Sequence, residues 1–338
     1  MIPHNKPTLD QNELNAVDKV LMSNHLVYGN NIQKFEDEMC DFVGLPHGHA
    51  VCVSSGSSAL LIALHVLELK HKNVAIPSYA CSSIKNACLL NQSFPIYLDN
   101  QQGKPIVHIT ENDKNKLDGL IYPYLYGFSS TLPSIEGKPI IEDIAQSLGA
   151  SNNNQMLSTI GNIGILSFYA TKMITSGGQG GMLISRDKTF IQAAKDFILF
   201  DQKIDNNLHF NLHMTEIQAA IGRVQLKKLP EFIKKREDIW NIYNDEGLPL
   251  LDVQQLNLRH VRYRAIVLTP KQKELINTLK LNKVTAINPF TENELLSPHS
   301  TNALALTKQT VSLPIYPSLS IKQAKEIADI TLKALDSV

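Results

Sequence analysis

Residues 167–182 contain the sequence SFYATKMITSGGQGGM, which places a single lysine, Lys172, between a short apolar segment and a glycine-rich run. An amine can act as a nucleophile when burial lowers its pKa, and it can then form a Schiff base with a carbonyl group. Glycines allow the backbone to pack close to a flat ligand. The stretch therefore fits a lysine inside a site, and the alternative is a glycine-rich hairpin with an exposed lysine.

Short apolar runs lie on both sides of this stretch and predict β-strands. They are HAVCVS, NVAIPS, FPIYL, DGLIYPYLY, KPIIEDIA, GILSFY and GMLIS. Helical segments such as SALLIALHVLELK lie between several of them, and this alternation predicts an α/β layer with a mostly parallel, buried sheet. Because ligands of such sheets bind at the carboxyl ends of the strands, the residues that follow the runs are the candidates.

The first predicted strand ends in SSGSS at residues 54–58 and passes directly into a helix. The first N–H groups of a helix have no internal partner, and the helix dipole is positive there. With the hydroxyls of Ser57 and Ser58, this helix start is a candidate phosphate site. The alternative is an ordinary serine N-cap. The stretch does not match G-x-x-x-x-G-K-[ST], so a nucleoside triphosphate P-loop is not supported.

Asp143 follows the apolar run of KPIIEDIA, at the end of a predicted buried strand. A carboxylate there is costly unless it has a cationic or hydrogen-bonded partner, and a protonated ring nitrogen would be one. The alternative is a helix cap that faces solvent, and we expect Glu142 to be the solvated one of the two acids. A phosphate site, a carboxylate and a lysine together indicate pyridoxal phosphate, a cofactor that acts as an electron sink.

These motifs make the chain resemble the DegT/DnrJ/EryC1/StrS family of pyridoxal-phosphate-dependent aminotransferases, which act mostly on keto sugars of nucleotide diphosphates. The resemblance covers most of the chain, including VSSGSSAL, IEDIAQSLGA, SFYATKMITSGGQGGMLIS and FNLHMTEIQAAIGRVQL. It implies the α/β fold of PLP-dependent transferases of fold type I. The large domain, residues 1–235, would hold the mostly parallel central sheet flanked by helices, and residues 236–338 would form a smaller α+β domain.

The resemblance also implies roles around the cofactor ring. Lys172 matches the lysine that forms a Schiff base with pyridoxal phosphate, and Asp143 matches the carboxylate that pairs with the pyridine nitrogen. Gln146 matches a side chain near the phenolic oxygen of the ring. Cys81 stands at the position whose side chain covers the ring face, where the family usually has an aromatic residue.

A second group of matches concerns the cofactor phosphate. Ser57, Ser58 and Ser167 match residues that bind the phosphate within one chain. Asn211, in FNLHM, matches an asparagine that the neighbouring subunit gives to the phosphate. This match implies a homodimer with its active sites at the subunit interface.

The departures from the family lie mostly on the substrate side. His213 stands where arginine is common, and Gln179 stands where glutamate is common. The stretches DQKIDNNLHFNLHM and VTAINPFTENELLSPHS look shorter than their counterparts in the family. The part of the sequence that would bind the cofactor therefore matches the family better than the part that would bind the substrate.

The function that the resemblance implies is transamination. An amino acid, glutamate by analogy, would give its amino group, and Lys172 would move the proton as general base and acid. The acceptor would be a nucleotide-linked keto-deoxysugar of cell-surface polysaccharide or secondary-metabolite biosynthesis. Two alternatives remain open: an aminotransferase for a smaller ketone without a nucleotide, such as an aminocyclitol or antibiotic intermediate, and a non-catalytic relative.

Composition bounds the remaining possibilities. The chain has 32 Lys and Arg and 32 Asp and Glu, so no basic excess points to a nucleic-acid partner. The most apolar stretch, SSALLIALHVLEL, is shorter than the about 20 residues of a membrane span. The N-terminus shows no apolar signal core, so we expect a cytoplasmic protein. No C-x-x-C pair occurs and the histidines are scattered, so we expect no metal site.

Overall fold

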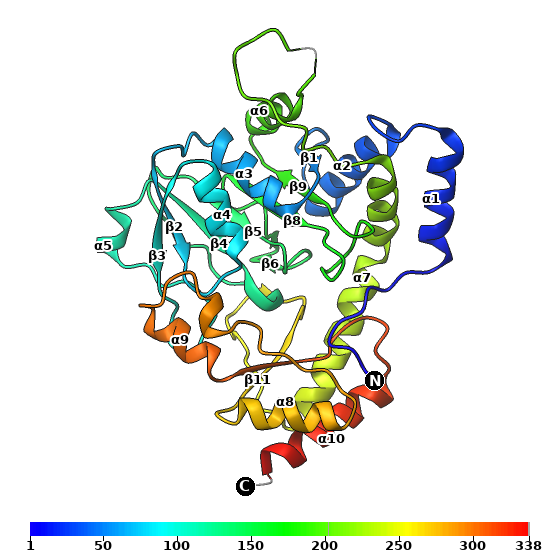
Figure 1. Cartoon of the computed structure of the whole chain (residues 1–338), viewed down its shortest axis with the longest axis vertical. Helices are drawn as coiled ribbons and strands as arrows, with labels where there is room; N and C mark the ends of the chain where they lie inside the picture. Colours follow the sequence, from blue (N-terminus) through cyan, green and yellow to red (C-terminus); the bar gives the residue numbers. More distant parts are fainter. Residues whose placement is uncertain (202, 337–338) are drawn as a thin grey trace.

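A computed structural model describes residues 1–201 and 203–336, and it contains a central β-sheet (Figure 1). Seven strands form this sheet in the order β1-β9-β8-β5-β4-β2-β3. They are β1 (Ala50–Val53), β2 (Asn73–Pro77), β3 (Phe94–Leu98), β4 (Gly119–Pro123), β5 (Ile140–Asp143), β8 (Ile163–Ser167) and β9 (Gly181–Ile184). Each of the predicted apolar runs contains or overlaps one of these strands, so these predictions are confirmed.

The sheet is mostly parallel, as predicted. β9 runs antiparallel to its neighbours β1 and β8, while the pairs from β8 through β5, β4 and β2 to β3 are parallel. Strands β1, β8, β5, β4, β2 and β3 therefore point the same way, and their carboxyl ends meet at one edge of the sheet. That edge is where the candidate residues of the sequence come together.

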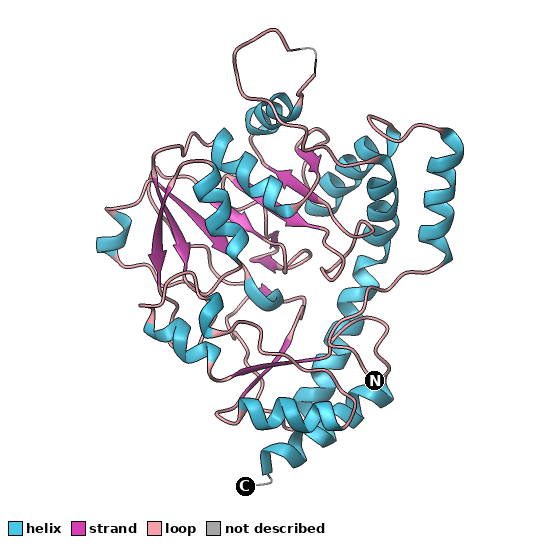
Figure 2. Cartoon of the chain, viewed as in Figure 1, coloured by secondary structure: helices cyan, strands magenta, loops and turns pink. Residues whose placement is uncertain are grey.

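Helices cover both faces of the sheet (Figure 2). One face packs against α3 (Gly56–Val66), α4 (Ser82–Leu90) and α6 (Lys188–Ile198). The other face packs against α2 (Asn30–Val43) and α7 (Glu216–Asp245). Because the strands are buried on both sides, they appear in the sequence as continuous apolar runs rather than as an alternating pattern. In the described part of the chain, no helix combines the length and apolar character that a membrane crossing requires.

Helix α7 leads from the central sheet to the C-terminal elements (Figure 1). The helical pattern of residues 215–247 leaves open a break at Pro230, but α7 runs unbroken for 30 residues through this proline. The C-terminal half of α7 packs with the antiparallel pair β11 (Ala265–Leu268) and β12 (Thr310–Leu313) in a separate apolar cluster.

The remaining elements are short or lie near the C-terminus. They are α5 (Glu111–Lys114), η1 (Leu125–Gly127), β6 (Ser151–Asn152), β7 (Gln155–Met156), β10 (Leu258–Arg259), α8 (Gln272–Leu281), η2 (Glu292–Glu294), α9 (Thr301–Thr307) and α10 (Ile321–Asp336). Helices α8 and α10 contribute buried side chains to the same C-terminal cluster as β11 and β12.

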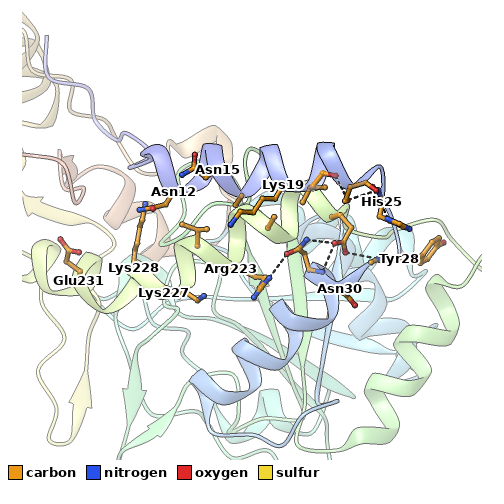
Figure 3. Close-up of a pocket in the computed structure, with 18 residues that line it drawn as sticks. Asn12, Asn15, Lys19, His25, Tyr28, Asn30, Arg223, Lys227, Lys228 and Glu231 are labelled. Atoms are coloured by element: carbon orange, nitrogen blue, oxygen red, sulfur yellow. Dashed lines mark hydrogen bonds between the residues drawn. The ribbon is translucent and has the colours of Figure 1, made fainter.

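The stretch TLDQNELNAVDKVLMSN predicts an amphipathic helix with a capping box of Asp10 and Glu13. The first helix, α1 (Gln11–Ser23), forms there with this capping box. Its packing differs from the amphipathic prediction, because Leu14 is 64% exposed and Leu21 is 51% exposed. The helix lies alongside α7 and faces it with polar groups, and Glu13 accepts a hydrogen bond of 2.7 Å from the Lys228 amine. A polar groove of about 880 Å³ separates the two helices (Figure 3).

Candidate active site

A cavity of about 240 Å³ opens at the carboxyl ends of β4, β5 and β8, beside the N-terminus of α3. Six of the eight predicted site residues line it: Ser57, Cys81, Asp143, Gln146, Ser167 and Lys172. The cavity shares no described lining residue with the larger groove between α1 and α7. The sheet topology therefore gathers the amine, the carboxyl group and the hydroxyls that the sequence singled out.

Lys172 is held in the loop between β8 and β9. The loop closes through hydrogen bonds from Phe168 N to Gly180 O (2.8 Å) and from Ala170 N to Gly178 O (3.1 Å). Lys172 itself is half-buried and lines the cavity. The alternative of a solvent-exposed lysine in a hairpin is therefore wrong.

The glycines of this loop serve a different purpose from the predicted one. Gly177 and Gly178 adopt positive φ angles of 85° and 138°, which side chains disfavour. A Cβ on Gly181 would lie 2.3 Å from the carbonyl oxygen of Ser55. None of the four glycines lines the cavity in the described part of the chain. They allow backbone segments, rather than a ligand, to approach one another closely.

Asp143 is the last residue of β5, is 8% exposed and lines the cavity. Burial raises the pKa of its carboxyl group, and the hydrogen bond from Ala145 N (2.9 Å) and the charge of Lys172 partly offset this rise. A buried carboxylate of this kind is stabilised by a proton donor placed in the cavity. The site therefore fits a ligand with a protonated ring nitrogen.

Glu142 is buried, contrary to the expectation that it would be solvated. Adjacent residues of a strand point to opposite faces of the sheet, so Glu142 points away from the side that Asp143 occupies. Its carboxylate accepts hydrogen bonds of 2.8 Å from Ile160 N and from Gly161 N. Burial raises its pKa, and these N–H groups oppose the rise. Glu142 thus holds a neighbouring turn in place.

Gln146 is oriented by the backbone. Its Oε1 atom accepts a hydrogen bond of 2.7 Å from Tyr126 N. Tyr126 has a positive φ of 63°, which is unfavourable for a bulky residue and aims this N–H at the amide. With its oxygen occupied, the amide can offer its NH₂ group to an oxygen acceptor in the cavity. This arrangement fits the phenolic oxygen of pyridoxal phosphate.

The N-terminus of α3 closes the other end of the cavity. A Cβ on Gly56 would lie 2.8 Å from the Cβ of Ser167, so the glycine lets the helix start and β8 approach closely. Ser57 and Ser167 both line the cavity, and hydroxyls at a helix N-terminus fit a phosphate. Ser58 does not line it, because its hydroxyl is hydrogen-bonded to those of Ser54 and Ser55, each at 2.9 Å.

Asn211 is exposed and does not line the cavity of its own chain. Its neighbour Leu212 accepts a hydrogen bond of 2.7 Å from Ser54 N, so this segment passes the end of β1. His213 packs edge-on against Tyr28, with ring centroids 4.9 Å apart. The structure therefore does not bring Asn211 together with the other predicted residues.

Several cavity residues were missed by sequence reasoning. Ser55 is the N-cap of α3, and Tyr124 directly follows β4. Inspecting the residue after the first predicted strand would have found Ser55, whereas Tyr124 lies within the predicted run DGLIYPYLY. Ser83 and Tyr169 also line the cavity, but no sequence signal distinguishes them from other polar loop residues.

The amine, the buried carboxyl group and the hydroxyls at a helix start are the groups that pyridoxal phosphate requires. A comparison with known families agrees: the family described as DegT/DnrJ/EryC1/StrS aminotransferase matches residues 7–331. The chain belongs to the DegT/DnrJ/EryC1/StrS aminotransferase family. The cofactor of this aminotransferase family is pyridoxal phosphate, as predicted. The non-catalytic alternative is not supported, because the family consists of enzymes.

Two curated relatives match this chain over nearly the whole length of both proteins. GDP-perosamine synthase of Escherichia coli O157:H7 is 27% identical and aligns over 97% of each chain. A transaminase of Campylobacter jejuni, named for UDP-4-amino-4,6-dideoxy-N-acetyl-beta-L-altrosamine, is 25% identical over 100% of this chain and 98% of its own. The crystal structure of the aminotransferase TlmJ from Streptoalloteichus hindustanus shares the fold, with a TM-score of 0.91, 22% identity and coverage of 100% and 99%.

Proposed function

We propose that this aminotransferase moves an amino group from glutamate to a keto sugar that is linked to a nucleotide. The observation that carries the proposal is the joint presence of Lys172 and Asp143 in one cavity at the strand ends. The two curated relatives described above are named for GDP- and UDP-linked sugars, which supports a nucleotide-linked acceptor.

Five cavity residues have a defined task in this proposal. Pyridoxal phosphate, when bound, supplies an aldehyde for the amino group and a ring that spreads negative charge. The Nζ of Lys172 would hold the aldehyde, and the free amine would take up and return the proton of the substrate carbon. Asp143 would keep the proton on the ring nitrogen, and Gln146 would donate to the phenolic oxygen. Ser57 and Ser167 would bind the phosphate and orient the ring.

Absorption spectroscopy of the purified protein tests the proposed function. We expect a visible band from bound pyridoxal phosphate that shifts when glutamate is added. A panel of GDP- and UDP-linked keto sugars and small ketones then identifies the acceptor. Turnover of small ketones but of no nucleotide-linked sugar would replace this proposal with the alternative of a non-nucleotide acceptor.

We propose further that the active sites lie at the interface of a homodimer, with Asn211 serving the neighbouring subunit. The cavity is smaller than the roughly 300–1,000 Å³ of typical ligand pockets, so a nucleotide sugar must extend beyond its mouth. The segment around Asn211 also exposes large apolar side chains: Leu199, Phe200, Leu208 and Phe210. An apolar surface of this kind is typical of a protein interface.

Mixing two inactive variants tests the shared site. A heterodimer of Lys172→Ala and Asn211→Ala subunits contains one site with both substitutions and one site with neither. Random mixing then restores about a quarter of the wild-type activity, because half of the dimers are heterodimers with one intact site. If both variants are inactive alone and mixing restores nothing, Asn211 acts within its own chain or not at all.

The division of the chain into residues 1–235 and 236–338 is also a proposal. The separate apolar cluster built from Ile239 onward supports it. However, Val261 and Tyr263 pack into the main core, so the two parts share contacts. The boundary lies inside α7, so separate expression of residues 236–338 tests the division, and a folded fragment by circular dichroism and urea unfolding is expected.

We propose a cytoplasmic location on the basis of the cysteines. All four are free: Cys40, Cys52, Cys81 and Cys88. Free cysteines are typical of a reducing compartment. Fractionation of cells that make the protein tests this location.

A further inference from the structure

Tyr263 contacts the catalytic region from outside the cavity. It is 4% exposed and lies shortly before β11, on the C-terminal side of α7. The Nζ atom of Lys172 lies 5.8 Å from the centroid of the Tyr263 ring. Tyr263 does not line the cavity, so it contacts the lysine from outside the space proposed for the cofactor. A residue distant in sequence therefore forms part of the surroundings of the amine.

Two arginines hold the same ring. The guanidinium carbons of Arg264 and Arg236 lie 5.3 and 5.7 Å from its centroid. Arg236 is 2% exposed and donates hydrogen bonds to the carbonyl oxygens of Tyr263 (3.1 Å) and Ile315 (2.6 Å). Cations are attracted to the negative face of an aromatic ring, so the three charges stabilise one position of Tyr263.

The charges around this ring are all positive in the described part of the chain. Among the described residues, the carboxyl group that interacts with the charge of Lys172 is that of Asp143, which lies in the cavity. His4, from the N-terminal segment, meets the Nη1 atom of Arg264 at 3.2 Å. Burial, Arg264 and Arg236 lower the pKa of His4 to about 3, so this imidazole is neutral near pH 7. A negatively charged or strongly polar oxygen is the group that such a cluster stabilises.

The phenolic oxygen of Tyr263 is the polar oxygen within this cluster of positive charges. Burial alone would raise its pKa, but Lys172, Arg264, Arg236 and hydrogen bonding with the Thr171 side chain together lower it. Thr171 directly precedes Lys172, and its carbonyl oxygen accepts a hydrogen bond of 3.1 Å from the Asn5 amide. The phenol thus interacts with both the lysine-bearing turn and the amine itself.

Given the role proposed for Lys172, we propose that Tyr263 is a positioning residue that holds the amine at the cavity. The ring provides a face for the ammonium group, and the phenolic oxygen provides a partial negative charge near it. Arg236 and Arg264 keep the ring in place and, as like charges, repel the ammonium group. Residues C-terminal to the central sheet thereby influence the position of the Lys172 amine.

The test uses Tyr263→Phe, Arg264→Met and a matched control, Tyr243→Phe. Tyr243 is also buried and donates a hydrogen bond of 2.7 Å to a backbone carbonyl, that of Pro314, away from Lys172. The first readout is the pH midpoint of the visible absorption of the bound cofactor, which reports protonation at the Lys172 nitrogen. The second is the rate at which the cofactor-free protein takes up pyridoxal phosphate.

We expect opposite shifts from the two variants. Tyr263→Phe removes a partial negative charge and lowers the midpoint by at least ~0.5 pH unit, whereas Arg264→Met removes a cation and raises it. Cofactor uptake slows in Tyr263→Phe and stays normal in Tyr243→Phe. If Tyr263→Phe matches the control in both readouts, the inference is wrong although the proposed function stands.

The inference can still be tested if one of the variants does not fold. If Tyr263→Phe does not fold, Arg264→Met decides, and an unchanged midpoint in that variant overturns the inference. If the wild-type protein shows no cofactor band at all, the proposed function itself has failed. The two failures are therefore distinguishable.

Discussion

The cavity at the strand ends and the largely exposed segment around Asn211, described for residues 199–201 and 203–213, differ in where they place the predicted site residues. In the cavity, side chains from five separate loops converge on one space of about 240 Å³. In the exposed segment, Asn211 faces solvent near the end of β1 and remains outside that space. The comparison teaches that the sheet topology of one chain assembles most of the cofactor groups, whereas Asn211 would join such a site only in the homodimer proposed above.

The largest effect is expected inside the cavity. Lys172→Ala removes the amine that holds the cofactor and moves the proton, so transamination falls by at least ~10³-fold. The visible absorption of the purified protein also changes. Lys227→Ala, an exposed lysine of α7 outside the cavity, is the control and keeps normal activity. An unchanged absorption band in Lys172→Ala would contradict the assignment of this lysine.

The two neighbouring acids on β5 are expected to have different roles: Asp143 in the reaction and Glu142 in stability. Asp143→Asn lowers kcat by roughly 10²–10³-fold, because the ring nitrogen loses its charged partner. Glu142→Gln weakens the hydrogen bonds to Ile160 N and Gly161 N and lowers the free energy of unfolding by about 1–3 kcal/mol. Steady-state kinetics and urea unfolding of both variants measure the difference. Equal losses of activity and stability in both variants would contradict the separate roles.

Substitution of Ser57 or Ser58, at the start of α3, is expected to have a smaller effect on cofactor binding. Ser57→Ala removes a hydroxyl that lines the cavity, and we expect about 10-fold weaker retention of pyridoxal phosphate. In Ser58→Ala the loss is only about 2-fold, because this hydroxyl bonds to Ser54 and Ser55 instead. Dialysis against phosphate buffer, followed by absorption measurement, ranks the two variants. The reverse order would show that Ser58 binds the phosphate.

The last prediction concerns the stability of the protein in acid rather than its activity. The pKa of His4 is about 3 in the folded protein against 6.5 for the ordinary group, so between these values the unfolded chain binds the extra proton. The free energy of unfolding therefore falls as the pH drops from 6.5 toward 3, by up to about 1.4 kcal/mol per pH unit. His4→Gln removes this dependence, and the exposed His71→Gln is the control. Urea unfolding of the cofactor-free proteins at several pH values measures the slopes, and equal slopes in wild type and His4→Gln contradict the prediction.

Much of the fold could be predicted because its signals are local. Apolar runs bounded by turn residues located the strands, and the Asp10–Glu13 capping box located the start of α1. The strand-end rule then pointed to Asp143 and the serines at the start of α3. The packing of α1 was mispredicted, because its apolar side chains show which faces can be buried but not which neighbour exists to bury them.

Within the candidate site, the sequence and the resemblance together identified the residue types, while their surroundings could not be predicted. Whether Glu142 or Asp143 faces the cavity depends on which face of β5 the loops cover. The hydroxyl of Ser58 is diverted by its own neighbours, which changes its role without changing the motif. These outcomes depend on side-chain directions that one sequence does not contain.

The sequence by itself determined the helices, the strands and the order in which they occur, because propensity and apolar periodicity act over a few residues. Only the tertiary structure decided which distant groups meet. Glu216 of α7 accepts hydrogen bonds from Gly29 N, Asn31 N and Ile32 N at the start of α2, and no feature near any of them predicts it. Tyr263 reaches Lys172 in the same way. Such contacts arise because the chain folds back on itself, so their partners are chosen by topology and not by local sequence.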